Sequence, residues 1–234
     1  LRPAALYWLG RASHAIGDDA GALTYLDLLR GAYPGNYYAV RGDEFRQTWN
    51  AKLFQSSAQK NMLLAPPTAE EQAEAEAWLL GWSPVQPAEG ETASALPDTL
   101  AQDDRLRRGL ILWELDLTED ASVQIRSLKS EINDSPLDLY RLGLLLEREE
   151  MYRLAVSCFD RVVELAPVER RAAVPTFLLK LTHPFHFSDL LVSQAVERDV
   201  DPLLLLSMVR QESSFEWHAQ SWAGAQGLMQ VMPT

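Results

Sequence analysis

Pairs of small residues recur along this chain at a fixed spacing of twelve positions. The pairs are Gly10 with Ala22, Gly109 with Ala121, and Gly143 with Ala155. A proline stands twelve positions beyond the alanine in the first and third pairs, at Pro34 and Pro167. Glycine and alanine leave room for a neighbouring backbone, and proline cannot continue a helix. The spacing therefore favours pairs of closely packed antiparallel helices over any arrangement of strands.

The distance between the second and third pairs indicates a repeat. Gly109 and Gly143 lie 34 positions apart, which resembles the tetratricopeptide pattern. The best copy spans 139–167, and the copy that starts at Gly109 is the weakest because Asn133 replaces its terminal proline. Residues 42–100 carry no clear copy, so the number of repeats stays open. Helical periodicity dominates residues 4–164. We therefore expect an all-α protein with a tetratricopeptide-like superhelix over 1–170.

Local signals set further boundaries. Residues 68–71 read Thr-Ala-Glu-Glu, a capping box that predicts a helix to about Trp82. The composition changes after Pro167, which predicts a linker over 171–184 and a second domain over 185–234. In that domain we expect one helix near Asp189–Arg198 and another over 201–212, opened by a cap residue and a proline.

Composition and charge exclude several classes of function. The net charge is −12, and a field of that sign repels a phosphate backbone, so nucleic acid is not an expected partner. No apolar run approaches the roughly 20 residues that span a bilayer. Cys158 is the only cysteine, and we expect a buried structural thiol. His183 and His186 flank Pro184 without a third ligand nearby, so we expect packing or loop roles and no metal.

One carboxylic acid stands out in the predicted helix 201–212. Glu212 falls on the same helical face as Leu205, Met208 and Val209, at the end of an apolar stripe. Burial and the negative end of the helix dipole both favour a neutral, protonated carboxyl group there. A protonated glutamic acid suits general-acid attack on a glycosidic oxygen. On helix position alone, the alternative is a glutamate that pairs with Arg210 or caps the next turn.

The residues after this helix carry a second motif. The glycines of Gly224-Ala-Gln-Gly227 leave room for a polymer, and Gln230 offers an amide. Arg-Gln-Glu-Ser at 210–213, the segment 221–230 and Met232-Pro233 together resemble the lytic transglycosylase domain of soluble murein transglycosylases, a relative of goose-type lysozyme. The lead-in His183-Pro184-Phe185 resembles the same family more faintly. The family commonly has Asn-Pro or Asp-Pro where this chain has Glu216-Trp217, which changes a loop edge.

The resemblance implies roles for the residues that match. Glu212 would be the single catalytic acid and base, cleaving the β-1,4 bond between N-acetylmuramic acid and N-acetylglucosamine to leave a 1,6-anhydro end. The resemblance places Ser221, Gln230, Met232 and Gly227 at the substrate cleft, with Arg210 and Ser213 as structural support. It implies peptidoglycan glycan strands as substrate, with no cofactor. Glu216 lies four positions after Glu212 and could serve as a second carboxylate, but we expect it to face solvent.

Two other functions stay open. The repeats could form a protein-binding adaptor with a non-functional catalytic remnant, or the enzyme could be a goose-type muramidase that uses water. We expect the chain to be an interior segment of a longer protein of the periplasm or extracellular cell envelope, whose repeats could also dock envelope proteins. The family's later Ala-Tyr-Asn motif would lie beyond Thr234. We therefore expect these 234 residues alone to be inactive.

Overall fold

The regular structure of this protein is helical wherever it is described. The computed structural model describes residues 2–49, 65–198 and 200–233, and in these ranges the only strand-like features are two isolated β-bridges. The helices are α1 (Pro3–Ala15), α2 (Asp19–Ala32), α3 (Tyr37–Trp49), α5 (Ala69–Leu80), α6 (Asp98–Ala101), α7 (Asp104–Glu114), α8 (Thr118–Glu131), α9 (Pro136–Arg148), α10 (Tyr152–Leu165), α11 (Val168–Arg171), α12 (Thr176–Thr182), α13 (Ser188–Glu197) and α14 (Pro202–Ser213). The predicted all-α class is confirmed. The parts of our sequence predictions that fall on residues 1, 50–64, 199 and 234 lie outside the described residues.

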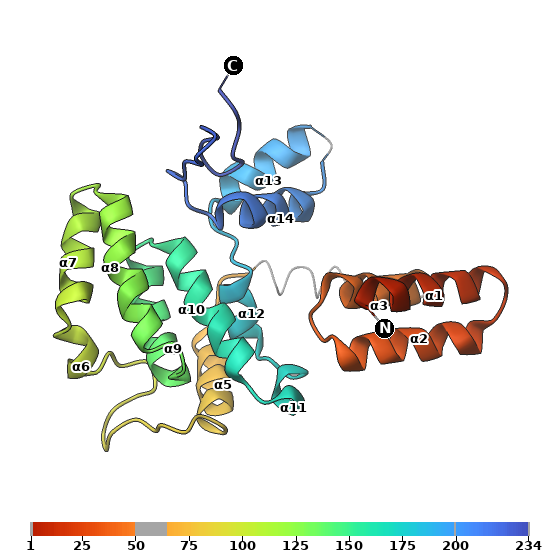
Figure 1. Ribbon diagram of the computed structural model, residues 1–234, viewed down its shortest axis with the longest axis horizontal. Helices are drawn as coiled ribbons and strands as arrows, with labels where there is room; N and C mark the ends of the chain where they lie inside the picture. The colour runs from red at the N-terminus through yellow and green to blue at the C-terminus, as the bar shows by residue number, and fades with distance from the viewer. Residues whose placement is uncertain (1, 50–64, 199, 234) are drawn as a thin grey trace. The chain divides into compact units, whose positions relative to one another are not determined.

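The chain divides into two compact units, residues 1–65 and residues 66–234. In the first unit, α1, α2 and α3 pack around a small core that includes Leu6, Leu26 and Leu29 (Figure 1). In the second unit, α7 pairs with α8 and α9 pairs with α10, and α5 and α12 complete the core beside them. The second unit also holds the segment that contains Glu212.

The repeated glycines lie where two helices of a pair approach each other. A Cβ atom added at Gly10, Gly109 or Gly143 would lie within 3.0 Å of a side chain on the partner helix. The side chains met are Leu26, Ile125 and Phe159, each sixteen positions after its glycine. The paired alanines, Ala22, Ala121 and Ala155, are completely buried. The predicted helical pairs are therefore confirmed, including the weak copy that starts at Gly109.

The prolines of the repeat mark helix ends as expected. α2 ends two residues before Pro34, and α10 ends two residues before Pro167. In the weak copy, α8 ends at Glu131, which is also two residues before Asn133. The helix ends there without proline, so proline is one way to stop the second helix and not a requirement of the repeat.

The predicted capping box is present at the start of α5. The Thr68 side chain accepts from the Glu71 backbone, and the Glu71 side chain accepts from the Thr68 backbone. The Glu71 carboxylate also accepts a hydrogen bond from Lys180 of α12, with both of its oxygens 2.8 Å from Nζ. This contact ties the start of α5 to α12 within the second unit.

The segment 171–184, for which we predicted a linker, contains a buried helix. Leu178 and Leu181 of α12 lie in the large core of the second unit, beside α10 and α5. The change of composition after Pro167 indicates a break, but Thr176–Thr182 supplies four apolar residues in seven. The domain boundaries placed at 170 and 185 stay a prediction.

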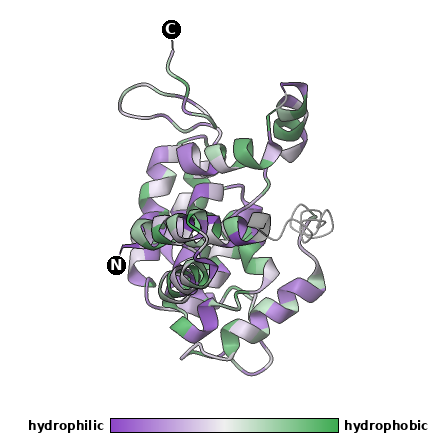
Figure 2. Ribbon diagram, turned by 90° about the vertical axis from the view of Figure 1, so that its right-hand side faces the viewer, coloured by the Kyte–Doolittle hydropathy of each residue, from purple (hydrophilic) through white to green (hydrophobic). Residues whose placement is uncertain are grey.

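Most helices carry both hydrophobic and hydrophilic residues, as expected of helices that turn one face to a core and the other to solvent (Figure 2). Among the described residues, no helix combines the length and hydropathy needed to cross a lipid bilayer.

Candidate active site

Glu212 lies in the last turn of α14, and the start of this helix is well defined. Asp201 caps it by accepting from the Leu203 backbone at 2.9 Å, and Pro202 occupies the first turn. The helix ends at Ser213, and the next two residues, Ser214 and Phe215, both have left-handed backbone angles, with φ of 51° and 65°. Few residues other than glycine adopt this region. Burial of the Phe215 side chain, which is 1% exposed, stabilises the reversal.

The buried row of α14 differs from the stripe that we predicted. The structure buries Leu206, Val209 and Ser213, together with Leu191 and Phe215 from neighbouring segments. Val209 belongs to both rows, whereas Leu206 and Ser213 lie beside the predicted stripe on the helix surface. The side chains of Glu212 and Met208 are exposed, Met208 by 44%. The described residues therefore do not supply the burial that we expected for Glu212.

The exposed row of α14 forms an open surface. Leu205 is half-buried, and Met208 and Glu212 follow it at helical spacing toward the end of the helix. An apolar strip that ends in a carboxyl group is thus accessible to a large ligand.

Arg210 connects α14 to the helices α12 and α10. Its Nε donates to the backbone oxygen of Thr182 at 2.7 Å, and its Nη2 lies 3.2 Å from both carboxylate oxygens of Asp160 in α10. Ser213 donates from Oγ to the Val209 backbone oxygen at 3.2 Å. Burial raises the pKa of Asp160, and the Arg210 charge opposes that shift. These contacts hold the helix that carries Glu212 in place.

The loop after α14 is held by the side chains that the resemblance assigned to the cleft. Ser221 Oγ accepts from the Ala225 backbone at 3.0 Å, and Gln230 Nε2 donates to the backbone oxygens of Ala219 and Gly227 at 3.0 and 2.9 Å. Gly227 has a φ of 73°, which an L side chain rarely adopts. Met232 is 56% exposed. In this structure Ser221 and Gln230 shape the loop, and their contacts with substrate stay a prediction.

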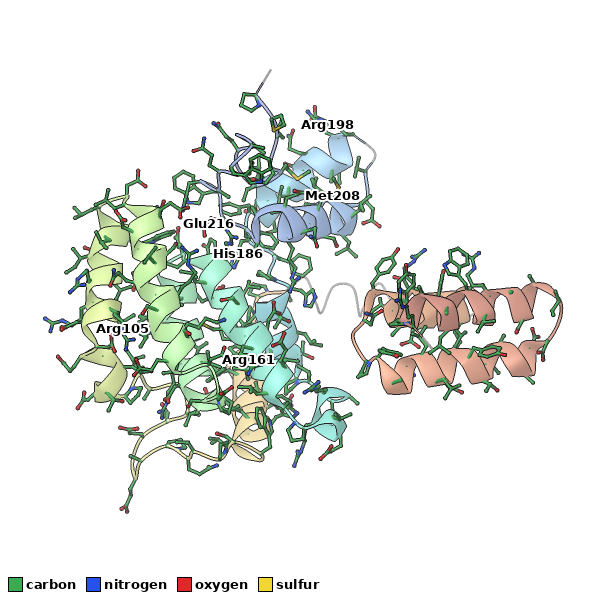
Figure 3. All side chains as sticks on the ribbon, in the orientation of Figure 1. Arg105, Arg161, His186, Arg198, Met208 and Glu216 are labelled. Atoms are coloured by element: carbon green, nitrogen blue, oxygen red, sulfur yellow. The ribbon has the colours of Figure 1, made fainter. Side chains whose placement is uncertain are left out.

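The expectation that Glu216 faces solvent is wrong. Its side chain is 8% exposed, and its Oε1 lies 2.9 Å from Nε2 of His218. The His218 ring in turn lies 5.1 Å from the ring of Trp113 in α7. In Figure 3 the label of Glu216 stands between α14 and the ends of the scaffold helices. The helix has already ended and reversed at 214–215, so Glu216 no longer follows the helical spacing from Glu212.

The surroundings of Glu216 and His218 favour the uncharged form of each side chain. Burial raises the pKa of Glu216 to about 7; the negative charge of Glu119 adds to this and the positive charge of Arg153 opposes it. Burial also lowers the pKa of His218, although Asp116 and Glu119 act in the opposite direction. Spacing in the sequence offered no signal for this pair. The only hint was the departure from the family pattern at Glu216-Trp217.

The two histidines before α13 have packing roles. His186 stacks on Tyr152 with ring centres 3.7 Å apart, and its Nε2 lies 3.0 Å from Glu147 Oε1. His183 contacts the Thr182 hydroxyl through Nδ1 at 2.9 Å. Across the described parts of the chain, no group of three histidine, cysteine, aspartate or glutamate residues could hold a metal ion.

Comparison with known proteins matches two parts of the chain to families. Residues 190–234 match the family model described as Transglycosylase SLT domain, and residues 4–36 match a family model described as Tetratricopeptide repeat. No curated protein matches the chain. The resemblance drawn from the motifs at 210–213 and 221–230 is therefore confirmed for the terminal segment, and the repeat is confirmed for its first copy.

A solved structure is similar in fold to most of this chain. The 70 kDa soluble lytic transglycosylase Slt70 from Escherichia coli has a TM-score of 0.50 and 19% identity, over 99% of this chain and 35% of that chain. A complex of the 70-kDa soluble lytic transglycosylase with bulgecin A has a TM-score of 0.49 and 16% identity over the same shares. This chain thus spans about a third of the length of the structures that it matches. At 19% identity the likeness to Slt70 concerns the fold alone.

Proposed function

We propose that this chain carries the first part of the catalytic domain of a peptidoglycan lytic transglycosylase, mounted on a helical-repeat scaffold. The observation that carries the proposal is the match of residues 190–234 to the transglycosylase family model, because this segment contains Glu212 at the end of α14 and the glycine-rich loop after it. The environment would be the periplasm or the extracellular cell envelope, where peptidoglycan is found.

Glu212 would act as the single acid and base. Its carboxyl group would protonate the oxygen that leaves between N-acetylmuramic acid and N-acetylglucosamine. The resulting carboxylate would then take the proton of the muramyl 6-hydroxyl group, whose oxygen attacks the anomeric carbon of the same sugar. The glycosidic bond breaks, a 1,6-anhydro bond forms, and the proton returns to Glu212. No water is consumed and no metal is required.

The exposed row of α14 supports this role for Glu212. A glycan strand lying along Leu205 and Met208 would cover the carboxyl group and remove water from it, which favours the neutral, proton-donating form. The bonds of Arg210 to Thr182 and Asp160 would keep the helix end in place while the strand binds. The repeats would guide the polymer or dock envelope proteins, since helical-repeat surfaces serve both purposes.

The test is digestion of purified peptidoglycan by the full-length protein and by its Glu212→Gln variant. We expect mass spectrometry to detect 1,6-anhydromuramyl ends with the parent protein and a loss of activity of at least about 100-fold in the variant. Glu197→Gln is the matched control, because Glu197 is an exposed carboxylate at the end of the preceding helix α13. Full activity of E212Q would show that Glu212 is not the acid.

The same digestion separates the two alternatives. Reducing ends in place of anhydro ends would support a muramidase that uses water. The buried position of Glu216 against His218 speaks against a second catalytic carboxylate at that residue. Absence of cleavage by the full-length protein, combined with retained binding of envelope proteins, would support the adaptor.

A further inference from the structure

The irregular segment after α14 forms an open pocket of about 420 Å³, whose lining includes Gly227 but no other residue that the resemblance assigns to the substrate cleft. Its lining residues come from both arms of the loop and are Trp217, His218, Ala219, Gln220, Gln226 and Gly227. Small-molecule sites typically measure about 300–1,000 Å³ and combine aromatic walls with a few polar groups. The pocket has the size of such a site, with one indole and two amide side chains in a lining that is more polar than apolar.

The aromatic wall of this pocket is held in place. Trp217 is 55% exposed, although large aromatic side chains are usually buried. Its ring meets the His218 ring edge to face, with centres 4.9 Å apart. His218 is fixed in turn by Glu216 at 2.9 Å and by the ring of Trp113 at 5.1 Å. The indole is therefore presented at the surface by a buried support.

Two amide side chains provide the polar groups. The backbones of Gln220 and Gln226 form an antiparallel bridge, which fixes their positions across the loop. Both residues are exposed, and no side-chain hydrogen bond ties either amide to the part of the chain that the structure describes. Each amide can both donate and accept a hydrogen bond. They are therefore available to a ligand, whereas the Gln230 amide is engaged within the loop.

The chemistry of the lining selects the kind of ligand. The pocket has no lysine or arginine, and the chain carries a net charge of −12, so an anionic ligand is disfavoured. An indole face suits the apolar face of a pyranose ring, and paired amides suit an acetamido group. An uncharged N-acetylated sugar satisfies both requirements at once.

We propose that this pocket is a subsite for one N-acetylhexosamine unit of a glycan strand. This proposal rests on the proposed function, since that function supplies the glycan. Trp217 follows Glu212 by five residues, so the two Cα atoms lie within about 18 Å of each other. A short glycan strand spans that distance. The subsite would hold the strand while another part of it reacts.

The test is binding of tetra-N-acetylchitotetraose to the 234-residue chain labelled with 5-fluorotryptophan, followed by fluorine NMR. We expect the resonance that disappears in Trp217→Phe to shift with the sugar. Trp217→Ala should weaken binding at least about fivefold, as truncation of a central interface tryptophan does, and W217F should weaken it less. Gln226→Ala provides a second variant that leaves the indole and its support intact.

Trp222→Ala is the matched control, because Trp222 is completely exposed in the same loop and does not line the pocket. W222A should bind within twofold of the parent. Equal loss in W217A and W222A, or no shift of the Trp217 resonance, would overturn the subsite. This readout is independent of bond cleavage. Binding at Trp217 with no activity of the full-length protein would therefore reject the proposed function alone.

Discussion

The Nε2 atom of His218 lies 2.9 Å from Oε1 of Glu216, and this pair connects the terminal segment to the repeat scaffold. His218 contacts Trp113 of α7, whose Nε1 donates to the Glu149 backbone at the end of α9. The loop that follows Glu212 is thereby held against helices that lie about a hundred positions earlier. Glu216 and His218 are both titratable, so the contact between them responds to pH.

We expect ionisation of Glu216 to destabilise the fold as the pH rises. Burial raises the pKa of this carboxyl group from 4.5 to about 7. Between these values the folded chain holds a proton that the unfolded chain has released, so this contribution to stability is lost as the pH rises from about 4.5 through about 7. Near pH 8, Glu216→Gln should be more stable than the parent by up to about 3 kcal/mol. Near pH 4, the stabilities of the two proteins should be closer to each other.

Urea denaturation across this pH range measures the difference. His218 titrates in the opposite sense, because burial lowers its pKa, and it is present in both proteins. Glu114→Gln, an exposed carboxylate at the end of α7, should follow the parent. If the stability of E216Q varied with pH in the same way as that of the parent, the assignment of a raised pKa to Glu216 would be contradicted.

Arg210 should be needed for the stability of α14 in its place on the scaffold. Arg210→Ala leaves the half-buried Asp160 carboxylate and the Thr182 backbone oxygen without their donor. Because both charged side chains are partly exposed, we expect a loss of about 1–3 kcal/mol in the free energy of unfolding. Arg210→Lys should recover only part of it, because lysine lacks the planar set of donors. Arg198→Ala, at the exposed C-cap of α13, should change stability by less than about 0.5 kcal/mol. Equal losses of stability in R210A and R198A would show that the contacts of Arg210 do not stabilise the position of α14.

The pair of Lys180 and Glu71 should stabilise the junction of α5 and α12 above the pH at which Glu71 is protonated. The Lys180 side chain is 4% exposed, and its hydrogen bond lowers the pKa of Glu71. This stability is present above pH 4.5, the ordinary pKa of Glu71, and is lost as the pH falls through the lowered value. Lys180→Met should cost about 3 kcal/mol at neutral pH in thermal or urea unfolding.

The double variant tests whether that cost comes from the pair. K180M together with Glu71→Gln should recover stability relative to K180M, because no unpaired charge is left. If the two substitutions simply add, the ion pair is not the source of the loss.

A methyl group at Gly143 should force the α9–α10 pair apart. The added Cβ would lie 2.8 Å from the ring of Phe159, which is completely buried. We expect Gly143→Ala to destabilise the chain by about 1–3 kcal/mol. Gly31→Ala, within α2 and with open space around its Cβ, should instead stabilise by up to about 1 kcal/mol. Denaturation of both variants gives the comparison, and a stabilised G143A would contradict the packing argument.

Much of the fold follows from local pattern in the sequence. The glycine and alanine positions predicted the helical pairs because packing of two helices depends on small residues at fixed spacing. The capping box at Thr68 and the cap at Asp201 were predicted because a helix start is a local event. The helices α13 and α14 begin and end within one residue of their expected bounds.

The site was harder to predict because its geometry depends on contacts over long distances in sequence. The helical spacing placed Glu216 beside Glu212, but two residues with left-handed backbone angles intervene, and neither is glycine. No local signal predicts that reversal, since it depends on the burial of Phe215. The long-range partners of Arg210 and His218 are equally absent from any short motif.

The sixteen-residue offset between each repeat glycine and the side chain that covers it has an evolutionary consequence. Leucine, isoleucine and phenylalanine fill the same position in the three pairs, so one side chain determines how closely two helices approach. A larger residue at the glycine would require a smaller side chain sixteen residues later. Such coupled substitutions would let each hairpin diverge separately, while neighbouring hairpins keep their own spacing.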